Sequence, residues 1–360
     1  MAPTTSNAVF VVTGANTGLG FECCKALAKE PNRLIILAGR NTERVHAAVA
    51  EVTRVAAAST VVEPAIVDVA SLRSVRDFCD ELIRRDLQIT CLVCNAGIQV
   101  KEKAVTADGF EATIATNHIG HFLMTQLLLS RTKRIMTLSS ETHDQNEKTG
   151  LPAPSMADLA ALSKGLEPFD GLTAYTSSKL CALLHAKEHA RRYPRGPEIL
   201  AFTPGFTPDT SLFRANNRLV WAIAKPIVTW ISRWNGVRIS TPAYSGGMMA
   251  RIAASSSWAA DGWTSGDYVR IDEVYAASAE ACDAALGRAL WEQSEQWVKP
   301  TWLAASSSFK GESDFAKFEK PRRLQKHIDK IRYQKGLKAE DMFVRQRSTA
   351  MWVIDGPTTL

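Results

Sequence analysis

The stretch Thr13-Gly-Ala-Asn-Thr-Gly-Leu-Gly20 follows a short apolar run, Ala8–Val12, and leads into an amphipathic stretch, Leu19–Lys29. Its glycines let a backbone turn tightly between a strand and a helix and approach a pyrophosphate at the helix N-terminus. This context makes the motif stronger than an isolated glycine match, although a glycine-rich turn without a ligand is the alternative. The residues expected to bind a dinucleotide here are Thr13, Gly14, Asn16, Thr17, Gly18, Leu19 and Gly20.

Short apolar runs and amphipathic stretches continue to alternate after this turn. Runs that predict strands are Leu34–Ala38, Val61–Val67, Ile89–Cys94, Arg134–Leu138 and Ile199–Phe202. Stretches that predict helices are Thr42–Ala57, Leu72–Arg85, Phe110–Leu129 and Ala174–Arg192. Residues 266–270 predict a last strand, and Ala279–Trp297 predicts a late helix. The order predicts an α/β fold with a doubly wound (Rossmann), mainly parallel sheet and helices on both faces.

The chain has 360 residues and a net charge of +6, which is unevenly distributed. Residues 304–360 contain 12 Lys and Arg against 7 Asp and Glu, which gives +5 and leaves the rest nearly neutral. We therefore expect a catalytic domain over residues 1–303 that binds no nucleic acid, and a basic C-terminal extension over 304–360, partly helical or disordered. The extension is interpreted as a solvated tail, with a membrane surface or an acidic partner as alternatives.

Seven cysteines, an odd number, without an amino-terminal leader favour a reducing, cytoplasmic location. Cys91 and Cys94 have redox-motif spacing, but they lie inside an apolar strand, so we expect a structural role. No stretch reaches the roughly 18 uninterrupted apolar residues of a membrane span. The nearest, Leu219–Trp234, contains Lys225, Pro226 and Arg233.

The ends of the second and third predicted strands indicate which dinucleotide binds. The second strand ends in Gly39-Arg40, where an NAD enzyme usually offers a carboxylate to the ribose. Arg40 is suited to pair with a 2′-phosphate, so we expect NADP(H), with a surface arginine that binds no ligand as the alternative. Asp68, after the third strand, is placed to accept a hydrogen bond from adenine. Alternatively it caps the next helix, although Ser71 is better placed for that.

Polar residues also follow the fourth and fifth strands, at the sheet edge where doubly wound folds bind ligands. Asn95, Ala96 and Gly97 end the fourth strand and are expected to contact the cofactor. Asn117 lies within a helix, where asparagine has poor propensity, so it is a candidate for holding a water chain. Ser140 is placed to hydrogen-bond a substrate carbonyl. Each alone is also explained by ordinary termination of strands and helices.

Tyr175 and Lys179 lie one helical turn apart, on the same face. A cation about 4 Å from the phenol, at an effective dielectric of about 20, favours the phenolate by about 4 kcal/mol. This equals roughly three pKa units, so we expect Lys179 to lower the pKa of Tyr175 enough for acid and base catalysis.

Together these motifs resemble the short-chain dehydrogenase/reductase family over about residues 8–300. The matching pieces, in the family's order, are T-G-A-N-T-G-L-G, N-A-G at 95–97, Asn117, Ser140, Y-T-S-S-K and Pro204-Gly205. Within the family, residues 116–123 resemble the branch of retinol dehydrogenases and light-dependent protochlorophyllide reductases. Leu92–Asn95, Phe169–Gly171 and Leu212–Arg214 look most like the latter.

The resemblance implies a role for each matching residue. Tyr175 would protonate the substrate oxygen, Lys179 would hold the nicotinamide ribose, Ser140 would orient the carbonyl, and Asn117 would complete a proton relay. Pro204, Gly205 and Thr207 would contact the cofactor, and no metal would take part. Two departures stand out: Phe206 replaces the cysteine that protochlorophyllide reductases carry after Pro-Gly, and Asp209 falls where the family has a threonine.

The substrate wall is expected from residues 142–172 and 206–235. The second segment is rich in large apolar side chains such as Phe213, Trp221, Trp230 and Trp234, which suits a bulky apolar or aromatic carbonyl substrate. Packing against the sheet or a partner subunit is an alternative, and a peripheral membrane contact is a third. The oligomeric state is expected to be monomer or homodimer. His143 is interpreted as structural.

The sequence therefore predicts an NADP-dependent short-chain oxidoreductase that transfers hydride between nicotinamide and a carbonyl or alcohol of a bulky apolar substrate, in specialised metabolism. One alternative is a carbon–carbon double-bond reductase of the protochlorophyllide type. Another is a non-catalytic dinucleotide-binding scaffold that uses the basic tail as its interaction arm.

Overall fold

The structure is a computed structural model that describes residues 8–207 and 238–305, with side chains to residue 299. Contacts divide the chain into one unit over residues 1–301 and a second over 302–360. Most of the predicted substrate segment at 206–235, including Phe213, Trp221, Trp230 and Trp234, lies outside the described residues, as does nearly all of the basic extension.

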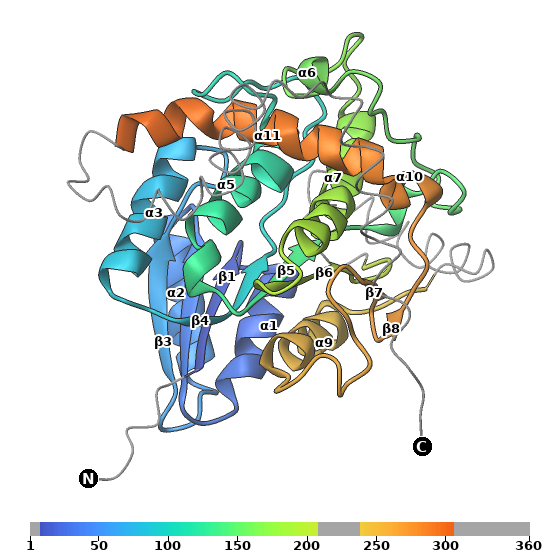
Figure 1. Cartoon of the computed structure of the whole chain (residues 1–360). Helices are drawn as coiled ribbons and strands as arrows, with labels where there is room; N and C mark the ends of the chain where they lie inside the picture. Colours follow the sequence, from blue (N-terminus) through green and yellow to red (C-terminus); the bar gives the residue numbers. More distant parts are fainter. Residues whose placement is uncertain (1–7, 208–237, 306–360) are drawn as a thin grey trace, which may run out of the picture. The chain divides into compact units, whose positions relative to one another are not determined.

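An eight-stranded sheet forms the centre of the first unit, in the order β3-β2-β1-β4-β5-β6-β7-β8 (Figure 1). Neighbouring strands are parallel except β7 and β8, which pair antiparallel. The strands are β1 (Ala8–Thr13), β2 (Arg33–Gly39), β3 (Val61–Ile66), β4 (Ile89–Cys94), β5 (Arg134–Leu138), β6 (Glu198–Thr203), β7 (Tyr268–Arg270) and β8 (Glu273–Val274). The predicted doubly wound α/β fold is thereby confirmed.

Helices cover both faces of this sheet (Figure 1). On one face lie α1 (Gly18–Ala28), α2 (Thr42–Thr53) and α9 (Pro242–Ala254), and on the other lie α3 (Leu72–Arg84), α5 (Gly120–Leu127) and α7 (Gly171–Arg192). Side chains cap the first turns of several of them, which explains where they begin. The capping residues are Asn41 for α2, Ser71 for α3, Asp170 for α7 and Thr241 for α9.

The hydrophobic core lies between the sheet and its helices. Central strands such as β1 and β4 are buried along nearly their whole length, whereas the edge strand β3 leaves Val61 and Ile66 exposed. Pro64 in β3 supplies no backbone donor, which is typical of an edge strand. The buried run of β4 includes Cys91 and Cys94, both free thiols, and burial raises the pKa of the Cys91 thiol to about 12.

Two predicted helices are interrupted. The stretch predicted over Phe110–Leu129 is divided into α4 (Ala112–Ile114), a π-helical turn η1 (Ala115–Ile119), α5 and a 3-10 turn η2 (Leu129–Arg131). The late helix divides into α10 (Ala279–Cys282) and α11 (Ala284–Ala305), because Asp283 is extended and caps α11 with its carboxylate. Hydrophobic periodicity does not reveal such breaks, since the same apolar face continues across them.

The loop between β5 and α7 contains a 3-10 turn, η3 (Glu141–His143), and a short helix, α6 (Leu159–Leu162). Near α7, helix α11 places Trp291 against Phe122 of α5, with ring centroids 5.0 Å apart. His118 Nε2 and Ser294 Oγ lie 2.7 Å apart across the same contact. These contacts attach α11 to the outer side of the helices that carry candidate site residues.

Candidate active site

A cavity of about 640 Å³ lies at the carboxyl ends of the parallel strands. It collects residues from the ends of six strands, β1 to β6, and from the first part of α7, as expected for this fold. Predicted site residues that line it are Gly14, Asn16, Thr17, Gly18, Leu19, Arg40, Asp68, Asn95, Ala96, Gly97, Ser140, Tyr175, Lys179, Pro204, Gly205 and Thr207. The lining does not include Thr13, Gly20 or Asn117.

The turn between β1 and α1 has the shape that its glycines predicted. Gly14 has a φ of +61° and Gly18 a φ of +62°, which residues with side chains rarely adopt. A Cβ on Gly14 would lie 2.7 Å from Ala96 Cα, whereas one on Gly18 would meet nothing within 4 Å. The first turn of α1 contains no acidic side chain. This open, uncharged helix start fits a pyrophosphate group.

Thr13 and Asn95 support this turn from beneath. Thr13 Oγ1 accepts hydrogen bonds of 3.0 Å from the backbone N–H groups of Asn95 and Ala96. Asn95 Nδ2 donates to Thr13 O at 2.8 Å. A Cβ on Gly20 would lie only 2.5 Å from Asn95 Nδ2, so a larger residue does not fit there. Thr13 and Gly20 were predicted to bind the cofactor, but they lie behind the cavity surface and shape it indirectly.

Arg40 and Asp68 lie at the rim of the cavity. Arg40 Nη1 is 3.9 Å from Asp68 Oδ2, and the Arg40 side chain is 71% exposed. The guanidinium therefore has room to meet an anionic group, although Asp68 is its present partner. Asp68 Oδ1 accepts from the Ala70 N–H, while Ser71 caps α3 as the sequence suggested.

Asn117 lies in the π-helical turn η1, a local widening that is frequent at functional sites. Its side chain accepts from Ile98 N at 2.8 Å and donates to Ile98 O at 3.0 Å and Ser178 Oγ at 2.9 Å. Its backbone also hydrogen-bonds His121, whose Nε2 lies 2.9 Å from Thr13 Oγ1. Asn117 thus joins three segments around the cavity, and the water chain expected there stays a prediction.

Tyr175, Ser140 and Lys179 meet inside the cavity. A side-chain hydrogen bond joins Ser140 and Tyr175. The Lys179 ammonium lies 5.4 Å from the centroid of the Tyr175 ring and donates to Leu138 O at 3.1 Å. Both side chains are more than nine-tenths buried.

The electrostatics of this trio differ from the expectation. Burial raises the pKa of Tyr175 to about 12, and the hydrogen bond with Ser140 only partly opposes this. Burial also lowers the pKa of Lys179 to about 8. The predicted lowering of the Tyr175 pKa by Lys179 is therefore not found here, because both groups lose water and the ammonium faces the ring and a carbonyl.

Two serines that sequence reasoning passed over support these residues. Ser178 Oγ donates to Tyr175 O at 2.6 Å while accepting from Asn117, and Ser139 Oγ donates to Lys179 O at 2.8 Å. Both stand beside residues already singled out, so adjacency to the motifs was the signal available. His143, interpreted as structural, lies against Tyr268 and accepts from Ser278 N outside the cavity lining.

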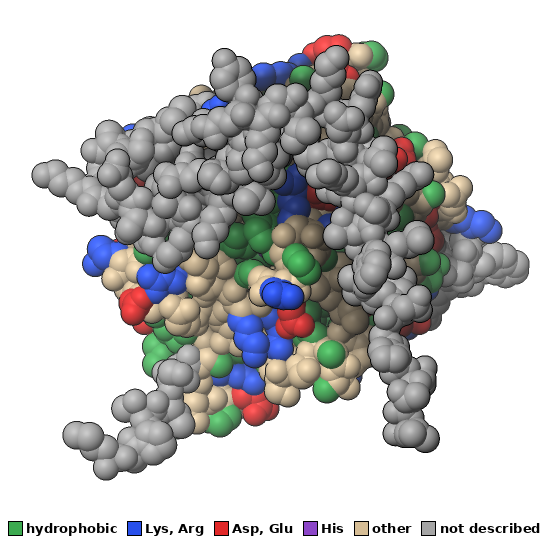
Figure 2. Space-filling view, in the orientation of Figure 1, with side chains coloured by type: hydrophobic (Ala, Val, Ile, Leu, Met, Phe, Trp, Pro, Cys, Tyr) green, Lys and Arg blue, Asp and Glu red, His purple; other side chains and the backbone are tan. Residues whose placement is uncertain are grey.

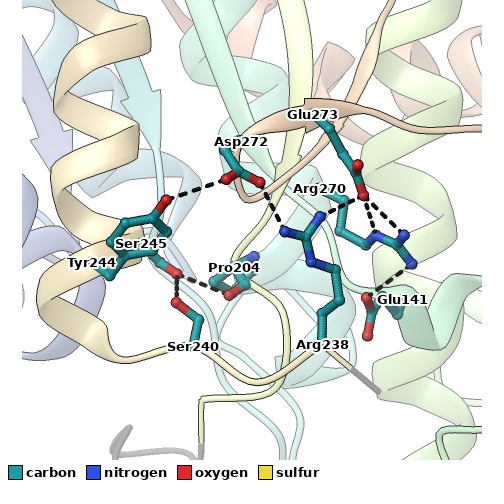
Figure 3. A network of polar contacts seen from close by, with 9 residues as sticks. All are labelled: Glu141, Pro204, Arg238, Ser240, Tyr244, Ser245, Arg270, Asp272 and Glu273. Atoms are coloured by element: carbon teal, nitrogen blue, oxygen red, sulfur yellow. Dashed lines mark hydrogen bonds and ion pairs between the residues drawn. The ribbon is translucent and has the colours of Figure 1, made fainter. Parts of the chain in front are cut away.

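The far wall begins with Pro204, Gly205, Phe206 and Thr207, all of which line the cavity. Phe206 and Ile239 form a parallel bridge, which places residues 204–207 beside the segment that starts at 238. Ser245 Oγ donates to Pro204 O at 2.8 Å and lies 2.6 Å from Ser240 Oγ (Figure 3). These bonds fix the turn that follows β6.

A chain of charges continues from this wall (Figure 3). Arg238 binds Asp272 at 3.1 Å and Glu273 at 2.5 Å, and Arg270 binds Glu273 at 3.0 Å. Arg270 also faces Glu141, which lines the cavity. These residues brace the β7–β8 turn, in which Ile271 has a strained φ of +60°.

The remaining cavity lining is mixed in character. From the predicted loop at 142–172 it receives Thr142, Lys148, Thr149, Leu151 and Leu172. Hydrophobic and basic side chains both lie near the centre of the face drawn in Figure 2.

The part of the chain described contains no helix long and apolar enough to cross a membrane.

The fold and this cavity define a dinucleotide-binding oxidoreductase. A family model described as short chain dehydrogenase matches residues 8–148. Protochlorophyllide reductase A, chloroplastic, of Oryza sativa subsp. japonica is 31% identical over 319 residues, covering 81% of this chain and 80% of the rice protein. The corresponding Pisum sativum protein is 32% identical over 317 residues, covering 80% and 77%. The chain belongs to the short-chain dehydrogenase/reductase family.

Solved structures share the fold of this chain. A crystal structure of an uncharacterized protein from Mycobacterium paratuberculosis has a TM-score of 0.60 and 29% identity, covering 82% of this chain and 95% of that one. The NADPH-dependent 3-quinuclidinone reductase of Rhodotorula rubra, 19% identical with a TM-score of 0.54 over 74% and 90%, shares the fold. A separate model, described as the catalytic core of eukaryotic DNA topoisomerase I, matches residues 306–358, which lie outside the described residues.

Proposed function

We propose that this protein is an NADP-dependent reductase that transfers hydride between nicotinamide and a carbonyl or alcohol of a bulky, largely apolar substrate. The observation that carries the proposal is the meeting of Ser140, Tyr175 and Lys179 in the cavity that also contains the glycine turn. Bound NADPH supplies the hydride. The residues of this chain position the reacting carbonyl and move the proton.

In this proposal Ser140 donates a hydrogen bond to the substrate oxygen, and Tyr175 delivers the proton to it. The high pKa of Tyr175 keeps its phenol protonated across the physiological range, which suits the direction of reduction. Lys179 faces Gly97, since a Cβ on that glycine would lie 3.7 Å from Lys179 Nζ, and the ammonium is placed to meet a ribose hydroxyl there. The hydrogen bond from Asn117 Nδ2 to Ser178 Oγ fixes the π-helical turn η1 against helix α7, which carries Tyr175 and Lys179.

The choice of NADPH over NADH rests on Arg40. It stands at the end of β2, lines the cavity and is largely exposed, so it suits a 2′-phosphate. A carboxylate directed at the ribose is the usual alternative in NAD enzymes. Here Gly39 and Arg40 occupy that strand end, and Asp68 lies 3.9 Å from the arginine.

A cofactor-consumption screen tests the proposal. NADPH oxidation is measured in darkness against aldehydes, ketones and polycyclic quinones, with the wild-type chain and Tyr175→Phe. We expect turnover of at least one bulky carbonyl compound, and a loss of at least about a hundredfold in Tyr175→Phe with NADPH binding retained. Full turnover in that variant would disprove the assigned mechanism.

A second candidate is reduction of a carbon–carbon double bond. The relatives from rice and pea are named protochlorophyllide reductases, and their similarity covers about four-fifths of this chain. Phe206, which lines the cavity after Pro204-Gly205, is the departure that disfavours it. Turnover of protochlorophyllide that requires light would establish this candidate, and protochlorophyllide that is left unreduced in the light, or reduced equally fast in darkness, would exclude it.

The environment of the enzyme is proposed from the sequence alone. We expect a cytoplasmic monomer or homodimer, with the basic extension solvated or in peripheral contact with a membrane. The rice and pea relatives are named as chloroplastic. Fluorescence imaging of the tagged full chain, with and without residues 304–360, tests the location and the contribution of the extension.

A further inference from the structure

His121 is a buried histidine behind the wall of the cavity. It is the second residue of α5, directly after the π-helical turn η1, and only 3% of it is exposed. Gly120 lets this part of the chain pass close to Val69, since a Cβ on Gly120 would lie 1.9 Å from Val69 O. The imidazole of His121 is not part of the cavity lining. It can therefore affect a bound dinucleotide only through the residues that it contacts.

The hydroxyl of Thr13 is the contact of His121 on the side of the cavity. Thr13 Oγ1 accepts hydrogen bonds of 3.0 Å from the N–H groups of Asn95 and Ala96. It also lies 2.9 Å from His121 Nε2 and 3.3 Å from Val93 O, which is long for a hydroxyl donor. A hydroxyl oxygen has two lone pairs, and the two N–H groups use both of them. The hydrogen in the contact with His121 therefore comes from Thr13, and Nε2 accepts it.

The second ring nitrogen of His121 has a different partner. A hydrogen bond with the backbone of Asn117 raises the pKa of the imidazole, in opposition to burial. A bond that favours the protonated ring is one in which the ring donates, and Nδ1 is the nitrogen left to donate. Burial lowers the pKa of His121 to about 4, and the charge of Lys179 adds to this effect. The ring is therefore neutral, with its hydrogen on Nδ1 and a lone pair on Nε2.

The backbone bound by this hydroxyl lies in the middle of the expected cofactor site. Ala96 and Gly97 line the cavity. A Cβ on Gly14 would lie 2.7 Å from Ala96 Cα, so the segment packs against the glycine turn. A Cβ on Gly97 would lie 3.7 Å from Lys179 Nζ. A shift of residues 95–97 would therefore change both the glycine turn and the surface beside Lys179.

We propose that His121 is a positioning residue for the dinucleotide: by accepting at Nε2 it fixes the Thr13 hydroxyl, and through it the backbone of residues 95–96. The inference rests on the proposed function, because it adds a residue to the NADPH site. Since Nδ1 of the same ring binds the turn that carries Asn117, one imidazole connects the cofactor side of the cavity to this turn.

Equilibrium binding of NADPH to the full chain, followed by fluorescence, tests three variants of His121. His121→Leu removes both ring hydrogen bonds and should weaken NADPH binding about tenfold. His121→Gln is long enough to place an acceptor near the position of Nε2, and should bind NADPH within about threefold of the wild type. His121→Asn reaches only the position of Nδ1, so it should bind NADPH as weakly as His121→Leu.

Two further substitutions separate this role from a general effect on folding. Thr13→Val removes the hydroxyl, so adding His121→Leu to it should weaken NADPH binding by no more than about a further twofold. His118→Met is the matched control, because His118 is a buried histidine of the preceding turn that faces Ser294 of α11. It should keep the NADPH affinity within about threefold of the wild type, even if its stability drops. Circular dichroism verifies that each variant is folded at the temperature of the titration.

The protonation of the ring is measured on the full chain without cofactor, by NMR of the imidazole nitrogens. The signals of His121 are assigned by their loss in His121→Gln. We expect a neutral ring at neutral pH, with its hydrogen on Nδ1. A hydrogen on Nε2, or an NADPH affinity in His121→Gln as low as in His121→Leu, overturns the inference. Equal losses of affinity in His121→Leu and His118→Met also overturn it.

Turnover is recorded separately with the carbonyl compounds of the screen. NADPH binding that depends on His121 as described, without NADPH consumption, supports the inference and counts against the proposed reductase activity. Reduction of a carbonyl compound by a wild-type chain whose NADPH affinity is unchanged in His121→Leu overturns the inference while leaving the reductase standing.

Discussion

The ammonium of Lys179 lies 5.4 Å from the centroid of the Tyr175 ring, over its face, and donates its hydrogen bond to the carbonyl of Leu138. A cation over an aromatic face is attracted to the ring. This geometry differs from a direct contact with the phenol oxygen, which the one-turn spacing suggested. Burial keeps Tyr175 protonated at neutral pH and lowers the pKa of Lys179 to about 8, nearer to neutral pH than that of Tyr175.

The first prediction concerns the pH dependence of cofactor capture. Burial lowers the pKa of Lys179 to about 8, so its charge is present below that pH and lost above it. Since kcat/KM reports groups of the free enzyme, kcat/KM for NADPH should be level below about pH 8 and fall about tenfold per unit above it. Lys179→Arg, which stays charged, should lose this decline; a decline that persists would assign it to another group.

The second prediction concerns Arg40. Replacing it with alanine should weaken NADPH binding by about tenfold to a hundredfold, because a charge-assisted hydrogen bond to the 2′-phosphate is lost, and should change NADH binding by less than about threefold. Arg44→Ala is the matched control, because this substitution removes a positive charge at a nearby exposed position. Titration of both nucleotides by fluorescence measures the effect. Equal losses for NADPH and NADH would refute the assignment.

The third prediction concerns stability in mild acid. Burial lowers the pKa of His118 to about 3 and those of His121 and His189 to about 4. The unfolded chain binds protons at these sites near pH 6.5, whereas the folded chain does not. Stability should therefore be complete above about pH 6.5 and decline as the pH falls toward 4, by several kcal/mol for the group.

Urea unfolding at pH 7.5, 6.5, 5.5 and 4.5 measures this dependence. His118→Met should make the free energy of unfolding less sensitive to pH over this range, even if its value at pH 7.5 drops. His46→Met, a substitution at an exposed site on α2, should leave the slope unchanged. Parallel slopes for all three proteins would show that His118 does not contribute.

The fourth prediction compares two neighbouring glycines of α9. A Cβ on Gly246 would lie 2.6 Å from Glu22 Cβ and 2.9 Å from Cys23 N of α1, whereas one on Gly247 would meet nothing within 4 Å. Gly246→Ala should lower the free energy of unfolding by about 1–3 kcal/mol through overpacking. Gly247→Ala should raise it by up to about 1 kcal/mol, because alanine favours the helix. Similar effects from both would contradict the close packing of α1 on α9.

Much of the candidate site followed from short motifs at strand ends. The residues of the glycine turn, Asn95–Gly97, Ser140 and Tyr175 were predicted, and most of them line one cavity because carboxyl ends of parallel strands share an edge. What the motifs did not show was the direction of each side chain. Thr13 belongs to the predicted set, yet it lies behind the cavity and supports the turn.

Glu141 is a residue whose burial and charged partner could not be predicted from the sequence. Nothing in the sequence around Ser140 distinguishes it from an exposed residue of a polar loop. It becomes notable only when the fold buries it beside the cavity and places Arg270, from a strand 129 positions later, within 3.7 Å. Long-range pairs of this kind depend on strand order, which local periodicity does not encode.

By itself, the sequence determined the α/β class, the order of strands and helices, and the type of site, because these depend on local periodicity and on glycines and polar residues at strand ends. Only the tertiary structure decided the electrostatics. Burial, which depends on every layer around the site, raised the pKa of Tyr175 where the spacing alone indicated a lower one. The tertiary structure also brought Glu141 and Arg270, which lie far apart in the sequence, within 3.7 Å of each other.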